Sequence, residues 1–361
     1  MRTSSGVRPK NILKIAGAYI AWVIGSGFAT GQEVLQFFSG YGYWSYAVVA
    51  INLVGFMLFG YLLMRTGFEN RHDPGFDHFR YYCGRRLGVG YSWLITVTLL
   101  LIPVLISGGG ATLREYYGIP KPVGSALLAA AVLAVYLIGF EKMVDIVSRI
   151  GPVIILFSLT VGIVSVLRGR GSWGDIPSYE AQLRLYRAAP TWWLSGILYL
   201  GLNFFPSSTY FTQLGASAQS EKDLKYGAIC GALLLILCIL IMSTAIMLNG
   251  SSAAGLEIPV LHLARNISAL FAAVFSVTLS LGIFSSCSVM LWSVCRNLTA
   301  RTHRSRLTAI AVVVFGYVVS LFPFGALVGT LYPLIGYVGL VYLACVLRRG
   351  LRRNVSRDGS R

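Results

Sequence analysis

The chain has 361 residues, of which 56% are hydrophobic and only 12% are charged, and its formal net charge is +17. Soluble domains carry roughly 25% charged residues. The few charges are also clustered, which leaves long apolar runs between them. This composition excludes an ordinary soluble protein. The basic residues lie mainly between apolar runs and in the tail 348–361, which indicates cytoplasmic loops and contact with lipid headgroups rather than nucleic-acid binding.

Apolar runs of about 20 residues are long enough to span a bilayer as helices. The sequence predicts ten such segments, and therefore an all-α, multi-pass membrane protein. They are residues 11–38, 44–64, 89–115, 123–140, 143–167, 191–216, 226–248, 269–296, 306–323 and 326–347. The first segment is too long for a signal peptide and has no small-residue cleavage site, so we expect it to remain attached.

The placement of Lys and Arg sets the expected orientation. The N-terminal tail 1–10, the loop 65–88 and the C-terminal tail 348–361 are rich in both residues, and most loops of the other side are not. The positive-inside rule then puts both termini in the cytoplasm. The loop 168–190 departs from this pattern, because it carries Arg168, Arg170, Arg184 and Arg187.

The two halves of the chain share one helix spacing. Five predicted helices lie in 11–167 and five in 191–347, and corresponding helices begin at offsets that agree to within about three residues. Five is an odd number, so the second half must enter the membrane from the opposite side. The pattern predicts a five-plus-five inverted repeat, as in secondary transporters, with 168–190 as an extracellular loop between the repeats.

The first helix of each repeat contains a helix breaker near its middle. It is Gly25-Ser26-Gly27 in the first helix and the stretch from Asn203 to Pro206 in the sixth. Glycine is costly in a helix and proline removes a backbone donor. Unwound backbone at membrane depth is tolerated where it lines a cavity or is buried in protein. The sequence therefore predicts that helices one and six are broken around a binding site, with a packing kink as the alternative.

The motif IGSGFATGQEVLQFF (24–38) resembles the first-helix signature of the YkvI-type family of bacterial membrane proteins, and EIPVLHLA (257–264) supports this resemblance. That family is similar to the LeuT-fold transporters of the amino acid–polyamine–organocation superfamily. The resemblance covers nearly the whole chain in topology. It implies a LeuT-like fold in a bacterial cytoplasmic membrane, a central site between helices one, three, six and eight, and alternating access.

The resemblance also implies site residues. Gly25, Ser26 and Gly27 match the break at which LeuT-like carriers meet the substrate carboxylate and a sodium ion. Ser285 and Ser286 match the adjacent hydroxyl residues of helix eight in sodium-coupled members. If the register shifts by one residue, Phe284 takes a hydroxyl position, and it offers no side-chain oxygen to a hard cation. Helix packing is the alternative role of these serines.

Other polar and aromatic residues in the spans are candidates from their own chemistry. Glu33 is an intramembrane carboxylate, which is usually functional, so it is assigned to coupling or gating, with a structural hydrogen bond as the alternative. Ser107 and Gly108 either open space for substrate or let helices pack closely. Asn203 either binds substrate or satisfies freed backbone, and Phe204 either packs or gates the site.

Catalytic signatures such as a nucleophile elbow, a Walker loop or HExxH do not occur in the sequence, so no enzyme is expected. We predict a secondary active transporter of a small organic solute, such as an amino acid, coupled to a sodium or proton gradient. The alternative is a non-transporting receptor that senses a ligand on the same scaffold. The expected partners are the small-molecule substrate and the lipid bilayer, with no cofactor beyond a sodium ion. The sequence does not determine the substrate or the oligomeric state.

Overall fold

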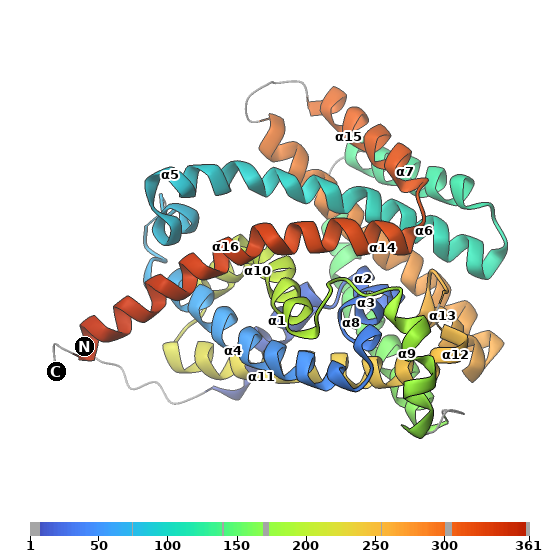
Figure 1. The fold of residues 1–361 in the computed structure, drawn as a ribbon. Helices are drawn as coiled ribbons and strands as arrows, with labels where there is room; N and C mark the ends of the chain where they lie inside the picture. Colours follow the sequence, from blue (N-terminus) through green and yellow to red (C-terminus); the bar gives the residue numbers. More distant parts are fainter. Residues whose placement is uncertain are drawn as a thin grey trace.

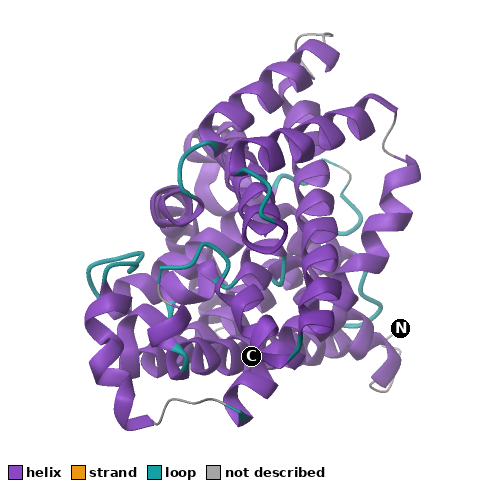
Figure 2. Ribbon diagram, turned by 90° about the vertical axis from the view of Figure 1, so that its right-hand side faces the viewer, coloured by secondary structure: helices purple, strands orange, loops and turns teal. Residues whose placement is uncertain are grey.

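The long helices of the protein run roughly side by side (Figure 1). The structure is a computed structural model that describes residues 8–358, except for 74, 139–140, 169–172, 254 and 300–304. The described residues form helices joined by loops and contain no strand, as Figure 2 shows. The prediction of an all-helical protein is confirmed.

Each of the ten predicted segments overlaps one or more helices among the described residues, and the first overlaps three of them. The first half contains α1 (Pro9–Val23), α2 (Ser26–Thr30), α3 (Gln32–Phe37), η1 (Ser39–Trp44), α4 (Ser45–Glu69), α5 (His78–Leu94), η2 (Ile95–Leu100), α6 (Leu101–Tyr117), α7 (Lys121–Ile138) and α8 (Glu141–Leu167). The second half contains η3 (Trp173–Asp175), α9 (Ile176–Arg184), α10 (Trp192–Ala216), α11 (Glu221–Leu248), α12 (Gly250–Ala253), α13 (Pro259–Ile267), α14 (Ala269–Thr299), α15 (Ser305–Ser320) and α16 (Phe324–Asp358).

Several helices have the length and composition of membrane spans. Among the described residues, five helical stretches are long and apolar enough to cross a bilayer: Ser39–Glu69, His78–Tyr117, Glu221–Leu248, Ala269–Cys295 and Phe324–Leu351. Three shorter apolar helices are Lys121–Leu137, Val153–Leu167 and Arg306–Ser320. The chain is therefore a multi-pass membrane protein.

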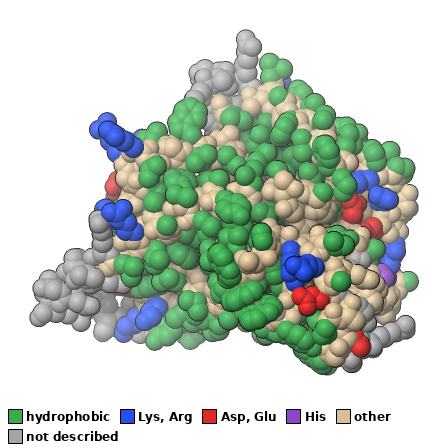
Figure 3. All heavy atoms as spheres, viewed as in Figure 1, with side chains coloured by type: hydrophobic (Ala, Val, Ile, Leu, Met, Phe, Trp, Pro, Cys, Tyr) green, Lys and Arg blue, Asp and Glu red, His purple; other side chains and the backbone are tan. Residues whose placement is uncertain are grey.

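The outer surface of these helices is apolar. Large apolar side chains on five different helices are more than half exposed, namely Val54, Leu127, Leu156, Val314 and Val341. Hydrophobic side chains cover much of the face shown in Figure 3, and Lys and Arg lie mostly toward its left and right edges. A soluble monomer rarely exposes so much contiguous apolar surface, so this surface fits contact with lipid.

The first predicted segment is interrupted twice in the structure. α1 ends at Val23, and Gly25 has extended backbone angles before α2 begins. Gly31, between α2 and α3, has φ 86°, a left-handed conformation that favours glycine. A Cβ at Gly31 would also lie 2.6 Å from Cγ2 of Val260, so α13 packs directly on this turn. These turns place α2 as a separate short helix inside the bundle.

The predicted break in the sixth helix is wrong. α10 is a continuous helix from Trp192 to Ala216 with Pro206 in its interior. Two side chains make local hydrogen bonds around the proline: Asn203 Nδ2 donates to the carbonyl oxygen of Tyr199 at 2.9 Å, and Ser207 Oγ donates to that of Asn203. α10 also packs between α4 and α16. Such side chains and neighbouring helices allow proline inside a membrane helix without unwinding it.

α4 and α10 approach closely enough for their backbones to touch. A Cβ at Gly215 of α10 would lie 1.8 Å from the carbonyl oxygen of Met64, and a Cβ at Gly67 of α4 would lie 1.8 Å from that of Thr212. The clashing atoms belong to the backbone, which cannot rotate away as a side chain can. The two glycines therefore fix the position of α10, which passes through the centre of the bundle.

We expect Gly215→Ala to destabilise the protein by about 1–3 kcal/mol, as overpacking does in other cores. The matched control is Gly17→Ala in α1, where an added Cβ meets nothing within 4 Å. That change should be neutral or stabilising, since alanine favours helices. Thermal unfolding of both variants in detergent tests this, and equal midpoints would contradict the proposed packing.

Candidate functional site

A small cavity lies where α2 meets three longer helices. Its empty volume is about 170 Å³ including its opening. The walls come from α2, α6 and α14 and from the start of α16, and most wall atoms are apolar. The lining residues are Gly27, Thr30, Val104, Leu105, Gly108, Ile283, Phe324 and Tyr332. Ligand pockets usually measure about 300–1,000 Å³, so this cavity is smaller than a typical ligand site.

Glu33 places a buried carboxylate at the edge of this cavity. The residue is 7% exposed, and Tyr199 Oη of α10 donates a hydrogen bond to Glu33 Oε1 at 2.6 Å. The second oxygen, Oε2, lies against two residues of the cavity wall. A Cβ at Gly27 would be 2.5 Å from Oε2 and 3.0 Å from Tyr332 Oη. Glycine at position 27 therefore lets the carboxylate pack directly against α2, in the place that a side chain would otherwise occupy.

The carboxylate of Glu33 has a hydroxyl neighbour but no basic one. None of the ion pairs within the described part of the chain includes it. An ionised carboxylate away from water is costly unless a cation or several donors compensate it. The described contacts thus supply no counter-charge for an ionised Glu33.

Two of the predicted substrate-binding residues, Gly27 and Gly108, lie in the cavity wall. The ring of Phe324 packs against Gly108, where an added Cβ would lie 3.0 Å from Phe324 Cε2. This close contact favours glycine at position 108. Gly25 lies at the turn before α2, outside the wall. The side chain of Ser26 lies outside the described residues. Ser107 Oγ donates to the carbonyl oxygen of Phe322 at 3.3 Å, which ties α6 to the segment before α16.

Asn203 and Phe204 are not among the residues that line the cavity. The side chain of Asn203 is hydrogen-bonded within its own helix. Phe204 is fully buried and packs on Phe56, Phe59 and Phe211, with ring centroids 5.0, 5.9 and 5.4 Å away. The described contacts therefore give both residues structural roles.

The serine pair of α14 lies close to the cavity but not in its wall. Ile283 is the wall residue of this helix. Ser286 follows three residues later, so it lies on the same helix face about one turn further along. Ser285 is buried and Ser286 is half-buried. A sodium site at these hydroxyls stays a prediction.

Tyr199 and Tyr332 are the site residues that the sequence did not identify. The chain contains 20 tyrosines, and no motif distinguishes these two from the others. Tyr199 lies one helical turn before Asn203 on α10, and Tyr332 lies on α16 next to Pro333. Their positions on these helices do not by themselves indicate an interaction with Glu33.

A second polar cluster borders the cavity where α13 begins. Glu257 Oε1 accepts hydrogen bonds from Lys121 Nζ at 3.2 Å and from the backbone N–H of Phe324 at 2.8 Å. The backbone N–H groups of Glu257 and Ile258 donate to Glu115 Oε1 at 2.7 and 3.0 Å. We call these contacts the Glu257 cluster. They join α6, α7, α13 and α16. Phe324 belongs to both the cluster and the cavity wall.

Two glutamines of α3 extend this connection. Gln32 Nε2 donates to the carbonyl oxygen of Leu256 at 2.6 Å. Gln36 Nε2 donates to that of Gly325 at 2.7 Å and to Gln32 Oε1 at 2.9 Å. The turn at Gly31 also packs against Val260, so the two sequence motifs at 24–38 and 257–264 are in contact in the fold.

Comparison with known proteins supports the fold. The chain is 24% identical over 342 residues to the uncharacterized membrane protein YkvI of Bacillus subtilis (strain 168), which covers 92% of this chain and 94% of that protein. It is 22% identical over 327 residues to YyaD of the same organism, covering 90% and 93%. The chain is homologous to these two proteins. No family model matches the chain.

Solved structures of membrane transporters share this architecture. The inward-facing conformation of Mhp1 matches with a TM-score of 0.63 at 13% identity, over 94% of this chain and 77% of Mhp1. MhsT in complex with L-phenylalanine matches with a TM-score of 0.52 at 14% identity, over 87% of this chain and 80% of MhsT. Both neighbours are LeuT-fold transporters, which confirms the resemblance inferred from the sequence.

We expect Tyr199→Phe to destabilise the protein by about 1–3 kcal/mol, because it removes the donor to a buried carboxylate and leaves the shape of the side chain unchanged. The control is Tyr226→Phe, because Tyr226 is 48% exposed on α11. Thermal unfolding midpoints in detergent measure the difference. A Tyr199 variant as stable as the Tyr226 variant would show that the hydrogen bond contributes little.

We also expect Glu257→Ala to loosen the contact between α13 and α16. Removal of the Glu257 carboxylate leaves the N–H of Phe324 without this acceptor. Lys121 still donates a hydrogen bond to the carbonyl oxygen of Phe322 at 2.7 Å. Hydrogen–deuterium exchange should rise in peptides covering 255–262 and 322–328. Glu180→Ala, which breaks the more exposed ion pair with Arg187, is the control and should leave these peptides unchanged. Unaltered exchange in the Glu257 variant would contradict a linking role.

Proposed function

We propose that the protein is a secondary active transporter of a small organic solute in a bacterial cytoplasmic membrane. The observation that carries this proposal is the cavity at the interrupted first segment, with the carboxylate of Glu33 at its edge. Similarity to LeuT-fold transporters supports it, although a fold alone does not determine function. Non-helical backbone inside a membrane bundle fits a ligand site.

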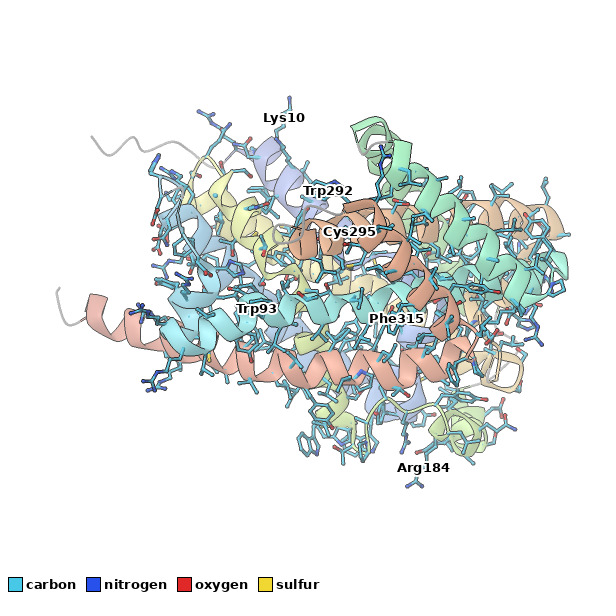
Figure 4. The ribbon with its side chains drawn as sticks, turned by 90° about the horizontal axis from the view of Figure 1, so that it is seen from above. Lys10, Trp93, Arg184, Trp292, Cys295 and Phe315 are labelled. Carbon is cyan, nitrogen blue, oxygen red and sulfur yellow. The ribbon has the colours of Figure 1, made fainter. Side chains whose placement is uncertain are left out.

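In the proposed topology, ten membrane helices form two inverted repeats at 11–167 and 191–347. The loop 168–190 is extracellular, and the tails 1–10 and 348–361 are cytoplasmic. The apolar outer surface of the helices supports this assignment. Arg184, at the end of α9, extends away from the helical body in Figure 4, as expected of a residue in a water-exposed loop.

The proposed mechanism is alternating access to the cavity. The Glu257 cluster and the two glutamines of α3 hold α13 against α16 beside the cavity. If the cavity opens between α13 and α16, these hydrogen bonds must break. If it opens on the opposite side, they stay intact. They provide the difference in contacts that two alternating states need.

The proposed coupling ion is sodium or a proton. Glu33 would take up the proton or compensate the charge of sodium. Ser285 and Ser286 would supply hydroxyl oxygens to sodium. Substrate would lie between α2 and α6, near Gly27 and Gly108. Gly25 and Ser26 would contribute through the turn before α2.

A thermal-shift screen of the purified protein is the first test. Amino acids are the first solutes to screen, since MhsT was solved with L-phenylalanine. A ligand that binds the folded state raises the unfolding midpoint according to its concentration relative to Kd. Each hit is then measured for uptake into proteoliposomes with an imposed sodium or proton gradient. Binding without accumulation under either gradient would contradict a transporter and favour a receptor.

We expect Glu33→Gln to abolish uptake driven by an imposed proton gradient, because an amide cannot take up and release the proton. Glu180→Gln is the matched control, since this carboxylate lies on the surface with its side chain 48% exposed, and it should leave uptake unchanged. Unchanged gradient-driven uptake in the Glu33 variant would remove this residue from coupling.

A further inference from the structure

A second pocket lies at one end of the bundle, where α4 and α16 meet the start of α5. Its empty volume is about 300 Å³ including its opening, which is larger than that of the cavity beside α2. Two of the wall residues are charged, and both are arginines: Arg65 of α4 and Arg349 of α16. α5 and the C-terminal part of α16 pack together toward the left of Figure 1. We call this feature the arginine pocket.

Arg65 brings a largely buried guanidinium to the arginine pocket, since its side chain is only 13% exposed. Its Nε lies 3.3 Å from Glu69 Oε1 and 3.4 Å from Glu221 Oε1. Neither carboxylate belongs to the pocket wall. Among the described residues, the two terminal nitrogens of Arg65 have no hydrogen-bond partner, because both ion pairs are made by Nε. These nitrogens are therefore donors available to a ligand.

Arg349 supplies a second guanidinium from the opposite wall element. Its Cζ lies 4.8 Å from the centroid of the Tyr81 ring, so the side chain packs on α5. A guanidinium that packs on an aromatic ring keeps the N–H groups at its edge free to bind. None of the ion pairs in the described part of the chain includes Arg349. Two guanidinium groups with unused donors favour an anion with several oxygens, and the fork of N–H groups matches phosphate best.

Direct contacts hold the three helices around the arginine pocket. Tyr82 Oη of α5 donates a hydrogen bond to Thr66 Oγ1 of α4 at 2.6 Å. Gly350 of α16 packs on Leu62 of α4, where an added Cβ would lie 3.1 Å from Leu62 Cδ2. The two arginines are therefore presented by elements that are already in place, which lowers the cost of ordering them around a ligand.

The location of the pocket favours a phospholipid over a soluble anion. The apolar stretches Ser39–Glu69 and Phe324–Leu351 both end beside it, which puts the pocket at the level of the lipid headgroups. On α4, Val54 and Leu58 are 65% and 38% exposed and precede the wall residue Leu62 at intervals of four, so the three lie on one helix face. This face leads from the pocket toward the middle of the bilayer and suits an acyl chain. Basic pockets between membrane helices on the cytoplasmic side are typical sites for anionic headgroups.

We propose that the arginine pocket binds the phosphate group of an anionic phospholipid from the cytoplasmic leaflet, with Arg65 and Arg349 as its ligands. The side of the membrane rests on the proposed topology, but the site is independent of transport and goes beyond the proposed function. A bound lipid links α4 of the first repeat to α16 of the second, so it stabilises the folded protein. A soluble phosphate ester offers the same group, and the experiment separates the two sources.

Three ligands test the proposal on the full-length protein, purified in neutral detergent and stripped of lipid. Dioleoyl phosphatidylglycerol and dioleoyl phosphatidylcholine share their acyl chains and the phosphodiester, but choline places a positive charge beside the phosphate. Glycerophosphoglycerol carries the headgroup of phosphatidylglycerol without the chains. Native mass spectrometry counts bound lipid, and thermal unfolding measures its effect on stability.

We expect phosphatidylglycerol to bind saturably and to raise the unfolding midpoint, and neither of the other ligands to do so at the same concentration. Equal binding of the two lipids would overturn the proposal, because the apolar surface alone would then explain it. A shift with glycerophosphoglycerol as large as that with the lipid would assign the pocket to a soluble phosphate ester and overturn the lipid source. Absence of binding by all three would overturn the site itself.

Variants then locate the contact. Arg349→Gln should weaken phosphatidylglycerol binding about tenfold or more, the effect of losing a hydrogen-bond donor to a charged group. Arg71→Gln is the matched control: Arg71 also packs on a ring, with Cζ 4.2 Å from the centroid of Phe68, but it lies outside the pocket wall. This control should bind the lipid as the unaltered protein does. An equal loss in both variants would show general attraction to basic surface and would contradict the assignment.

Arg65→Gln should weaken binding at least as much as the Arg349 variant, since Arg65 is the more buried of the two ligands. Unchanged affinity in a folded Arg65 variant would overturn its role. If that variant does not fold, because Glu69 and Glu221 lose their partner, the comparison of the Arg349 and Arg71 variants still decides the proposal.

Discussion

The structure depends on the need to satisfy backbone groups inside a membrane. No water is available there to bond a freed N–H or carbonyl, so an interrupted helix must be enclosed by protein. The interruption around α2 is enclosed by α6, α8, α13 and α14. Short-range bonds close the turns themselves: the N–H of Gly25 bonds the carbonyl oxygen of Val23, and that of Ala29 bonds the carbonyl oxygen of Gly25. Enclosure of α2 is what creates the cavity.

A buried carboxylate adds a second constraint, which links distant parts of the chain. Glu33 on α3 contacts Tyr199 of α10 and approaches Tyr332 of α16, so that one side chain joins both halves of the protein. Gly27 is required in the same place, because any Cβ would displace Oε2. Gly27 therefore does more than permit a turn, since it lets the carboxylate pack directly against α2.

The sequence predicted the helices well because membrane spans depend on local apolar length. It also located two wall residues, Gly27 and Gly108, because glycine in a membrane helix marks either close packing or open space. It did not predict the continuity of α10, because the effect of Pro206 depends on Asn203, Ser207 and the neighbouring helices. The sequence also did not predict the partners of Glu33, because they depend on tertiary packing. Tyr199 lies 166 residues away in sequence and comes near Glu33 only in the folded structure.

Phe324 connects the site to the surrounding scaffold. Its ring lies against Gly108 in the cavity wall, and its backbone N–H is held by Glu257, which also binds Lys121. A solute that pushes on this ring therefore acts on the start of α16 and on the cluster that fixes α13. Coupling between a ligand site and a moving element requires contacts that differ between two states. The contacts of Phe324 would serve a carrier and a receptor alike, so the decisive distinction between them is movement of the solute across the membrane.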